Sequence, residues 1–431
     1  MLARTLRGEG EGLVSPAADG GRPVHSNVYI PRLDVVYLNA GIGGWDGVPY
    51  LEAVWGCIKN MPEAVTYWKW FNFPEKGVLV KPQSEYLSAE EKEKQVSVTE
   101  KDKDDAEPPL GQIFCSNVFG HYLLTHELMP LLSVKRGRVD GDRGRVVFIS
   151  TLEPHADDLP MDDLQGLKSK NPYYGSKRLT DLLGLSAKLP AVRSINSDFY
   201  QLKNYKLPPY PYAEKKEENG TATTNGDTNA NDATDPEDEQ EIRPEFYVTQ
   251  PGIVNTNISG MNPLMSFLML MGFYLCRLLG SVWFPISAYP AAVAPVWVGL
   301  SPQALLDSME TPPPPPPAGS NQGSARNSTS SNSSLSSYGS WDAGDPVQAK
   351  VKWGSACDRF GNVRVLKTEV PGWGWSGRVG EVVREGRRSD AVDLEREARE
   401  DFESDGRYCW TYMEGLRKRW EGRLGVGDAA R

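Results

Sequence analysis

The sequence predicts an α/β fold in which helices cover both faces of a mostly parallel, doubly wound sheet. Three short apolar runs are typical of buried strands, at residues 34–38, 145–150 and 245–250. Helical patterns at 112–132 and 172–188 separate these runs. Strands that alternate with helices at such spacing indicate a parallel sheet, because parallel neighbours need a long crossover connection between them.

Each predicted helix has local signals of its own. Between 112 and 132 apolar side chains recur at three- and four-residue intervals, and Pro130 marks the expected end. Asn171 can cap the second helix. Pro172 suits the first turn, because a backbone N–H there has no partner within the helix.

Changes of composition predict where the folded part of the 431-residue chain lies. Tracts rich in Gly, Ser, Asn, Asp or charged residues bury too little apolar surface to fold. The expected divisions are a disordered N-terminus at 1–27, an α/β domain at 28–310 with an insertion at about 62–111 and a disordered insert at about 203–243, a low-complexity linker at 311–345, and a C-terminal extension at 346–431 that packs on the domain.

Residues 261–306 are the most apolar part of the chain, with Arg277 as their single charge. A spanning helix needs about 20 apolar residues, but four prolines interrupt the run after Arg277 and would break such a helix. We expect helices that cover an apolar pocket and dip into one leaflet of a membrane. An ordinary core-packing or oligomer surface is the alternative.

Charge and cysteine content exclude several classes of function. The net charge is −10 and no basic stripe with interleaved aromatics occurs, so we expect no nucleic-acid partner. Five scattered cysteines without a C-x-x-C pair predict neither a disulfide framework nor a metal site, and they favour a reducing compartment.

Tyr173 and Lys177 are four residues apart on the second predicted helix and therefore lie on one side of it. A phenol with a pKa of about 10 is a weak acid at neutral pH, and a nearby ammonium lowers that pKa by stabilising the phenolate. Such a pair can donate a proton to a carbonyl oxygen while hydride reaches the carbon. Tyr212 and Lys216 repeat this spacing in the polar insert, so the pair alone is a weak signal.

Other segments supply context, because the carboxyl ends of parallel strands meet at one edge of the sheet, where α/β proteins bind their ligands. Each segment alone has an ordinary explanation as a turn, a helix residue or a strand end. Their order along the chain predicts a carbonyl reductase that uses a nicotinamide cofactor. The residues concerned are Asn39 and Gly41 after the first strand, Asn117 in the first helix, Ser150 and Thr151 after the second strand, and Pro251, Gly252 and Thr256 after the third.

These motifs resemble those of the short-chain dehydrogenase/reductase family, which implies a Rossmann-like fold. Within that family the chain looks most like the fungal 3-keto-steroid reductases of ergosterol biosynthesis, over about residues 30–423 outside the polar inserts. The likeness is carried by segments 33–42, 116–118, 149–151, 171–177, 250–258, 274–280 and 352–361.

The resemblance implies a role for each catalytic residue. Tyr173 would donate the proton, and Lys177 would lower the pKa of Tyr173 and hold the cofactor ribose. Asn117 would take part in a proton relay. Either Ser150 or Thr151 would bind the carbonyl oxygen, and Thr151 is favoured because the second of two adjacent hydroxyl residues is the active one in the family.

The resemblance also implies NADPH as the cofactor and a sterol 3-ketone as the substrate, which is reduced to the 3-hydroxyl during C4 demethylation. The expected location is the cytosolic face of the endoplasmic reticulum membrane or the lipid droplet, in contact with the membrane surface and with other C4-demethylation enzymes. Besides the Tyr–Lys pair, the expected cofactor contacts are Asn39, Gly41, Pro251, Gly252 and Thr256.

One part of the family pattern is not found in the sequence. Only 33 residues precede Asp34, too few for three strands, their helices and a Gly-rich phosphate loop. We therefore expect an N-terminally incomplete fold. Two explanations are open: a truncated form of a working reductase, or a catalytically impaired reductase-like protein that serves as a membrane-associated partner of other sterol enzymes.

Overall fold

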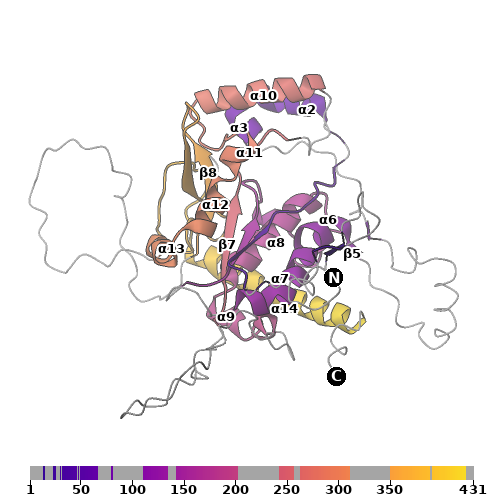
Figure 1. Cartoon of the computed structure of the whole chain (residues 1–431). Helices are drawn as coiled ribbons and strands as arrows, with labels where there is room; N and C mark the ends of the chain where they lie inside the picture. Colours follow the sequence, from indigo (N-terminus) through magenta and orange to yellow (C-terminus); the bar gives the residue numbers. More distant parts are fainter. Residues whose placement is uncertain are drawn as a thin grey trace, which may run out of the picture.

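A five-stranded sheet, in the order β3-β6-β7-β8-β9, forms the centre of the protein (Figure 1). The first four strands run parallel, and β9 returns antiparallel beside β8. The predicted α/β class and the three predicted strands are confirmed. The strands are β3 (Val35–Leu38), β6 (Arg145–Ile149), β7 (Glu245–Gln250), β8 (Lys352–Cys357) and β9 (Val363–Thr368).

The computed structural model describes residues 13–14, 23–25, 30, 32–45, 47, 49–66, 79–80, 110–133, 142–201, 242–256, 263–310, 350–388 and 391–423.

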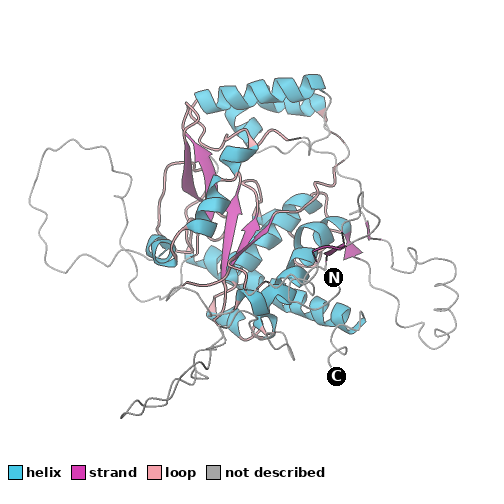
Figure 2. Ribbon diagram, in the orientation of Figure 1, coloured by secondary structure: helices cyan, strands magenta, loops and turns pink. Residues whose placement is uncertain are grey.

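Helices cover both faces of the sheet (Figure 2). On one face Phe148 belongs to a buried cluster with Leu182, and on the other Val147 belongs to a second cluster with Val298. Successive strand residues point to opposite faces, so β6 is apolar at consecutive positions because it is buried on both sides. The first face carries α7 (Gly120–Leu132), α8 (Pro172–Ser186) and α14 (Arg396–Arg423), and the second carries α12 (Val293–Leu300) and α13 (Gln303–Glu310).

The helix predicted at 112–132 is present but changes its winding. α6 (Gln112–Phe114) leads into a π-helical turn, η1 (Cys115–Phe119), which continues as α7. Pro130 lies in the last turn of α7, which ends at Leu132 as predicted. The π-helical turn contains Asn117, and such turns are frequent at functional sites.

Residues 346–431, expected as an extension packed on the domain, contribute strands to the sheet itself. β8 lies parallel to β7, with Lys352 opposite Val248. The last helix, α14, packs along α8 with Trp410 buried.

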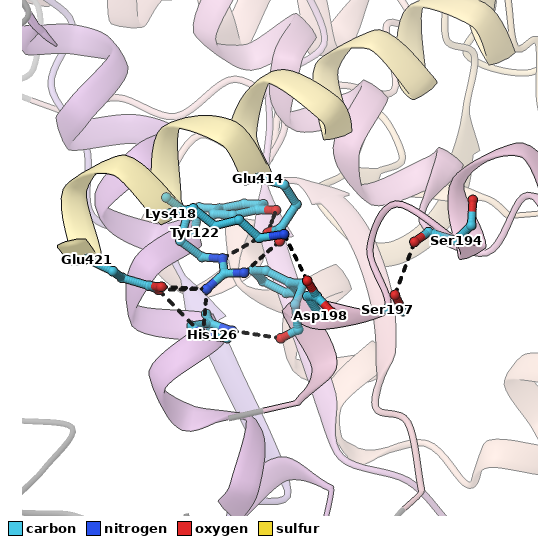
Figure 3. Close-up of polar contacts among 10 residues, drawn as sticks. Tyr122, His126, Ser194, Ser197, Asp198, Glu414, Lys418 and Glu421 are labelled. Carbon is cyan, nitrogen blue, oxygen red and sulfur yellow. Dashed lines mark hydrogen bonds and ion pairs between the residues drawn. The ribbon is translucent and has the colours of Figure 1, made fainter. Parts of the chain in front are cut away.

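Polar contacts also hold α14 in place, as Figure 3 shows. The Tyr122 hydroxyl on α7 donates to Glu414 Oε1 at 2.6 Å. Arg417 pairs with Glu414 at 2.6 Å and with Glu421 at 2.7 Å, and donates to His126 Nε2 at 3.0 Å. Because the partners satisfy one another inside a largely buried cluster, they fix the helix in one position.

A separate group of helices lies beyond the carboxyl ends of the strands, at the top of Figure 1. It consists of α2 (Tyr50–Lys59), α3 (Met61–Thr66) and α10 (Pro263–Leu278). Phe273 of α10 packs there in a small apolar cluster with Cys57. Within the described part of the chain, no helix combines the length and the apolar character that crossing a membrane requires.

Several expected segments fall wholly or partly outside the described residues. These are the N-terminus apart from two short strands, most of the insertion at 62–111, residues 203–241 of the polar insert, and the linker at 311–345. The remaining described elements are β1 (Leu13–Val14), β2 (Pro23–His25), β4 (Leu79–Val80), β5 (Leu110–Gly111), η2 (Ala156–Asp158), α9 (Pro190–Arg193), η3 (Asp198–Tyr200) and α11 (Ala288–Ala291).

Candidate active site

The residues predicted to form a site lie where β3, β6 and β7 end, at one edge of the sheet. Asn39 follows β3 and Pro251 follows β7. Ser150 follows β6, and its N–H donates to Thr249 O of β7 at 2.7 Å. The parallel sheet therefore brings these three chain segments together, as the sequence predicted.

Asn117 connects three segments at this edge. Its Oδ1 accepts from the Ile42 N–H at 2.8 Å, and its Nδ2 donates to Ile42 O at 3.0 Å. Nδ2 also donates to Ser176 Oγ at 3.0 Å, and that hydroxyl donates to Tyr173 O at 2.6 Å. A Cβ at Gly41 would lie 2.8 Å from Asn117 Oδ1, so glycine is needed for this close approach. Asn117 thus fixes the loop after β3 against α8.

Tyr173 and Lys177 lie one helical turn apart on α8. The Lys177 ammonium is 5.6 Å from the centre of the Tyr173 ring and donates to Ile149 O at 2.9 Å. Trp45 packs edge-on against the Tyr173 ring, with ring centroids 5.2 Å apart. The lysine is buried and the tyrosine is partly exposed.

The pKa of Tyr173 changes in the direction opposite to the expected one. Burial, with the Glu153 carboxylate nearby, raises the pKa of the phenol above its ordinary value. Burial lowers the pKa of Lys177 to about 8, with Asp181 acting to raise it and Lys352 to lower it. The expected lowering of the Tyr173 pKa is therefore wrong, because the loss of hydration and the Glu153 carboxylate both favour the neutral phenol.

The two adjacent hydroxyl residues differ in accessibility. Ser150 is buried, and its hydroxyl donates to Lys177 O at 3.4 Å. Thr151 is partly exposed, and its hydroxyl donates to Glu153 Oε2 at 3.4 Å. A carbonyl of a ligand can reach only an accessible hydroxyl, so the geometry favours Thr151.

The other predicted cofactor contacts lie at the same edge but are not joined to the Tyr–Lys pair. Gly252 has a φ of +69°, and a Cβ there would lie 2.6 Å from Pro285 Cδ, so the position needs glycine. Pro251 is half-buried, whereas Asn39 and Thr256 are exposed. Among the described residues, no hydrogen bond connects Asn39 or Thr256 with the Tyr–Lys pair.

Four residues of the site were not predicted. Trp45 and Glu153 each lie a few residues after a predicted strand, and this position after a strand end could have indicated them as site residues. Asp181 continues the four-residue spacing after Lys177, which also could have been noticed. Lys352 had no local signal, because nothing in the sequence relates β8 to the turn after β6.

The site suits the nicotinamide end of a dinucleotide. It combines a buried ammonium at Lys177, a partly exposed tyrosine at Tyr173 and an exposed glycine at Gly41. Within the described ranges, no strand leads through a Gly-rich turn into a helix ahead of β3, so no pyrophosphate site is seen there. The same ranges contain no group of three or more His, Cys, Asp or Glu residues that could hold a metal ion.

The sequence is similar to several proteins that share one name. The 3-keto-steroid reductase of Aspergillus fumigatus is 34% identical over 411 residues, which cover 94% of this chain and 74% of the relative. That of Gibberella zeae is 30% identical over 417 residues, covering 94% and 70%. That of Saccharomyces cerevisiae is 30% identical over 268 residues, covering 62% and 54%. No family model and no solved structure matches the sequence.

Proposed function

The chain belongs to the 3-keto-steroid reductases, a family of short-chain dehydrogenases/reductases, and we propose that it reduces a sterol 3-ketone to the 3-hydroxyl with NADPH. The reaction would serve ergosterol biosynthesis, during removal of the C4 methyl groups. The observation that supports it most is the Tyr173–Lys177 pair on α8. Asn117 is linked through Ser176 to Tyr173 O, and Lys177 donates to Ile149 O at the end of the strand that precedes Thr151. The choice of NADPH over NADH rests on the family alone.

Each residue of the site has a part in this reaction. NADPH supplies the hydride to the carbonyl carbon when it is bound. The Thr151 hydroxyl donates a hydrogen bond to the carbonyl oxygen, and Tyr173 donates its proton to that oxygen as negative charge develops there. The raised pKa of Tyr173 keeps the phenol protonated at neutral pH. The Lys177 ammonium compensates the charge of the phenolate that remains.

A cofactor titration followed by turnover tests this proposal. We expect NADPH to bind below millimolar concentration, measured by nicotinamide fluorescence, and a sterol 3-ketone to be converted to the 3-hydroxyl, measured by mass spectrometry. If NADPH does not bind at millimolar concentration, the chain is not a reductase by itself. That result would favour the alternative role, a membrane-associated partner of other sterol enzymes.

We propose that α2 and α10 contact a membrane, at the cytosolic face of the endoplasmic reticulum or on a lipid droplet. The two helices share a small apolar cluster, and both expose many large apolar side chains, which soluble monomers rarely do over a contiguous area. Helices with one exposed apolar side lie at the boundary between headgroups and acyl chains. α12, from the same apolar stretch, packs on the sheet instead, with Val298 fully buried. The exposed side chains include Leu51, Trp55 and Ile58 on α2 and Phe267, Leu268 and Met271 on α10.

Replacing Trp55 and Phe267 by serine is expected to weaken binding to vesicles of neutral and anionic phospholipids by at least about tenfold, because two large apolar side chains are removed. Vesicle co-sedimentation measures the change. Phe360→Ser is the matched control, since this phenylalanine is 81% exposed on the turn between β8 and β9. Equal binding by the double variant and the unchanged protein would contradict the proposed contact.

A further inference from the structure

Lys352 and Asp181 form a buried ion pair beside the Tyr–Lys pair. Lys352 Nζ lies 2.8 Å from Asp181 Oδ2, and both side chains are 1% exposed. The same ammonium donates to Thr151 O at 2.6 Å. Lys352 thus reaches from β8 past β7 to the turn that carries the accessible hydroxyl.

This pair is costly for the fold if it serves stability alone. Removing two charges from water costs several kcal/mol per ion in a folded protein, and apolar residues of similar volume often stabilise as well or better. The position lies on the sheet face otherwise filled by Phe148 and Val248. A buried pair at such a place needs another explanation, and its contact with Thr151 O suggests one.

The spacing along α8 shows what Asp181 would do without its partner. Tyr173, Lys177 and Asp181 are separated by four residues each, so the carboxylate lies one turn from the Lys177 ammonium. Asp181 Oδ1 has no hydrogen-bond partner among the described residues. Opposite charges attract strongly at low dielectric, so an unpaired Asp181 would draw the Lys177 ammonium away from Tyr173.

We propose that Lys352 is a positioning residue for the reduction: it pairs with Asp181 so that Lys177 stays available to Tyr173, and it holds Thr151 O so that the Thr151 hydroxyl stays in place. This role rests on the proposed function. Lys352 itself does not touch the reacting atoms.

The charged groups around Lys177 come from several elements. Burial acts most strongly and lowers the pKa of Lys177, Asp181 on the same helix raises it, and Lys352 on β8 lowers it, with a net pKa of about 8. His121 on α7 faces Lys177, and burial together with that ammonium lowers the pKa of His121. Glu153, after β6, acts on Tyr173 and on Lys352. Removal of Lys352 should therefore raise the pKa of Lys177, and removal of the Asp181 charge should lower it.

The pKa of Lys177 can be measured without turnover. In protein labelled with [ε-¹³C]lysine, the Lys177 signal is assigned by its absence from Lys177→Met. We expect the signal to titrate at higher pH in Lys352→Met and at lower pH in Asp181→Asn. Lys350→Met is the matched control, since Lys350 is also buried near the start of β8 but pairs with Glu245 and Glu310. It should leave the titration of Lys177 unchanged.

Turnover gives the second measurement. Lys352→Met should lower kcat by about 100-fold, the order of loss that a small misplacement of reacting groups causes. The alkaline limb of the pH–rate profile of Lys352→Met should move to higher pH. Lys352→Arg should retain most of kcat. The double variant Lys352→Met/Asp181→Asn removes both charges of the pair, so neither is left without the other, and it should fold. It should keep a low kcat, because Thr151 O still lacks its donor.

Two results would overturn the inference. One is an unchanged Lys177 titration in both Lys352→Met and Asp181→Asn, and the other is full kcat in the double variant. If the two single variants shift the titration in opposite directions but the unchanged protein reduces no sterol ketone, the coupling of Lys352 to Lys177 stands and the proposed function fails.

Discussion

Replacing Tyr173 by phenylalanine is expected to lower kcat for sterol 3-ketone reduction by about 10²- to 10⁴-fold, the usual contribution of a positioned general acid. The change removes the proton donor and nothing else, because the ring can still pack edge-on against Trp45. Cofactor affinity should stay nearly the same, since the Lys177 ammonium keeps its bond to Ile149 O. Steady-state kinetics measure the loss, and nicotinamide fluorescence measures the affinity.

Tyr200→Phe is the matched control for this variant. Burial raises the pKa of Tyr200 as well, but Tyr200 packs against Phe199 of η3 and Phe246 at the start of β7, away from the carboxyl ends of the strands. Removal of the Tyr200 hydroxyl in Tyr200→Phe should leave kcat unchanged. Retained turnover in Tyr173→Phe would remove Tyr173 from the mechanism, whatever the control shows.

Replacing Glu245 by glutamine is expected to destabilise the fold by about 3–5 kcal/mol at pH 7, the usual cost of breaking a buried ion pair from one side. Glu245 is almost fully buried and lies 2.9 Å from Arg143 and 3.2 Å from Lys350, with Lys188 also paired to it. Without the carboxylate, these cations lose their common partner. Urea unfolding at pH 7 measures the free energy of unfolding, and the exposed Glu400→Gln on α14 should change it by less than about 0.5 kcal/mol.

The same carboxylate should make stability depend on acid pH. Burial acts to raise the pKa of Glu245, but Lys350, Lys188 and Arg143 outweigh it and bring the pKa from 4.5 to about 2. A lowered folded-state pKa stabilises the fold above the unfolded value, and this contribution is lost as pH falls from 4.5 to 2. It amounts to about 3 kcal/mol at 1.4 kcal/mol per pKa unit. Unfolding measured through this range should be less pH-dependent in Glu245→Gln, and an equal dependence would contradict the assignment.

The parts of the fold that sequence patterns predicted are those with local signals. β3, β6 and β7 are apolar runs next to turn residues, and the start of α8 is marked by Asn171 and Pro172. The Tyr173–Lys177 pair was predictable for the same reason, since helical spacing alone places both on one side.

Other parts had no such signal. β8 was assigned to an extension, because about a hundred residues separate it from its neighbour β7. The direction of the Tyr173 pKa was also missed, since a spacing argument includes the ammonium and leaves out dehydration and Glu153.

The sequence by itself therefore determined the fold class, three parallel strands and the chemical groups at their carboxyl ends, because burial and helical spacing follow from the order of neighbouring residues. Only the tertiary structure decided that β8 enters the sheet, that Lys352 reaches Thr151 O and Asp181, and that α12 is buried while α10 is exposed. These outcomes depend on distances between residues far apart in the chain and on how much water surrounds each group, and no local pattern carries that information.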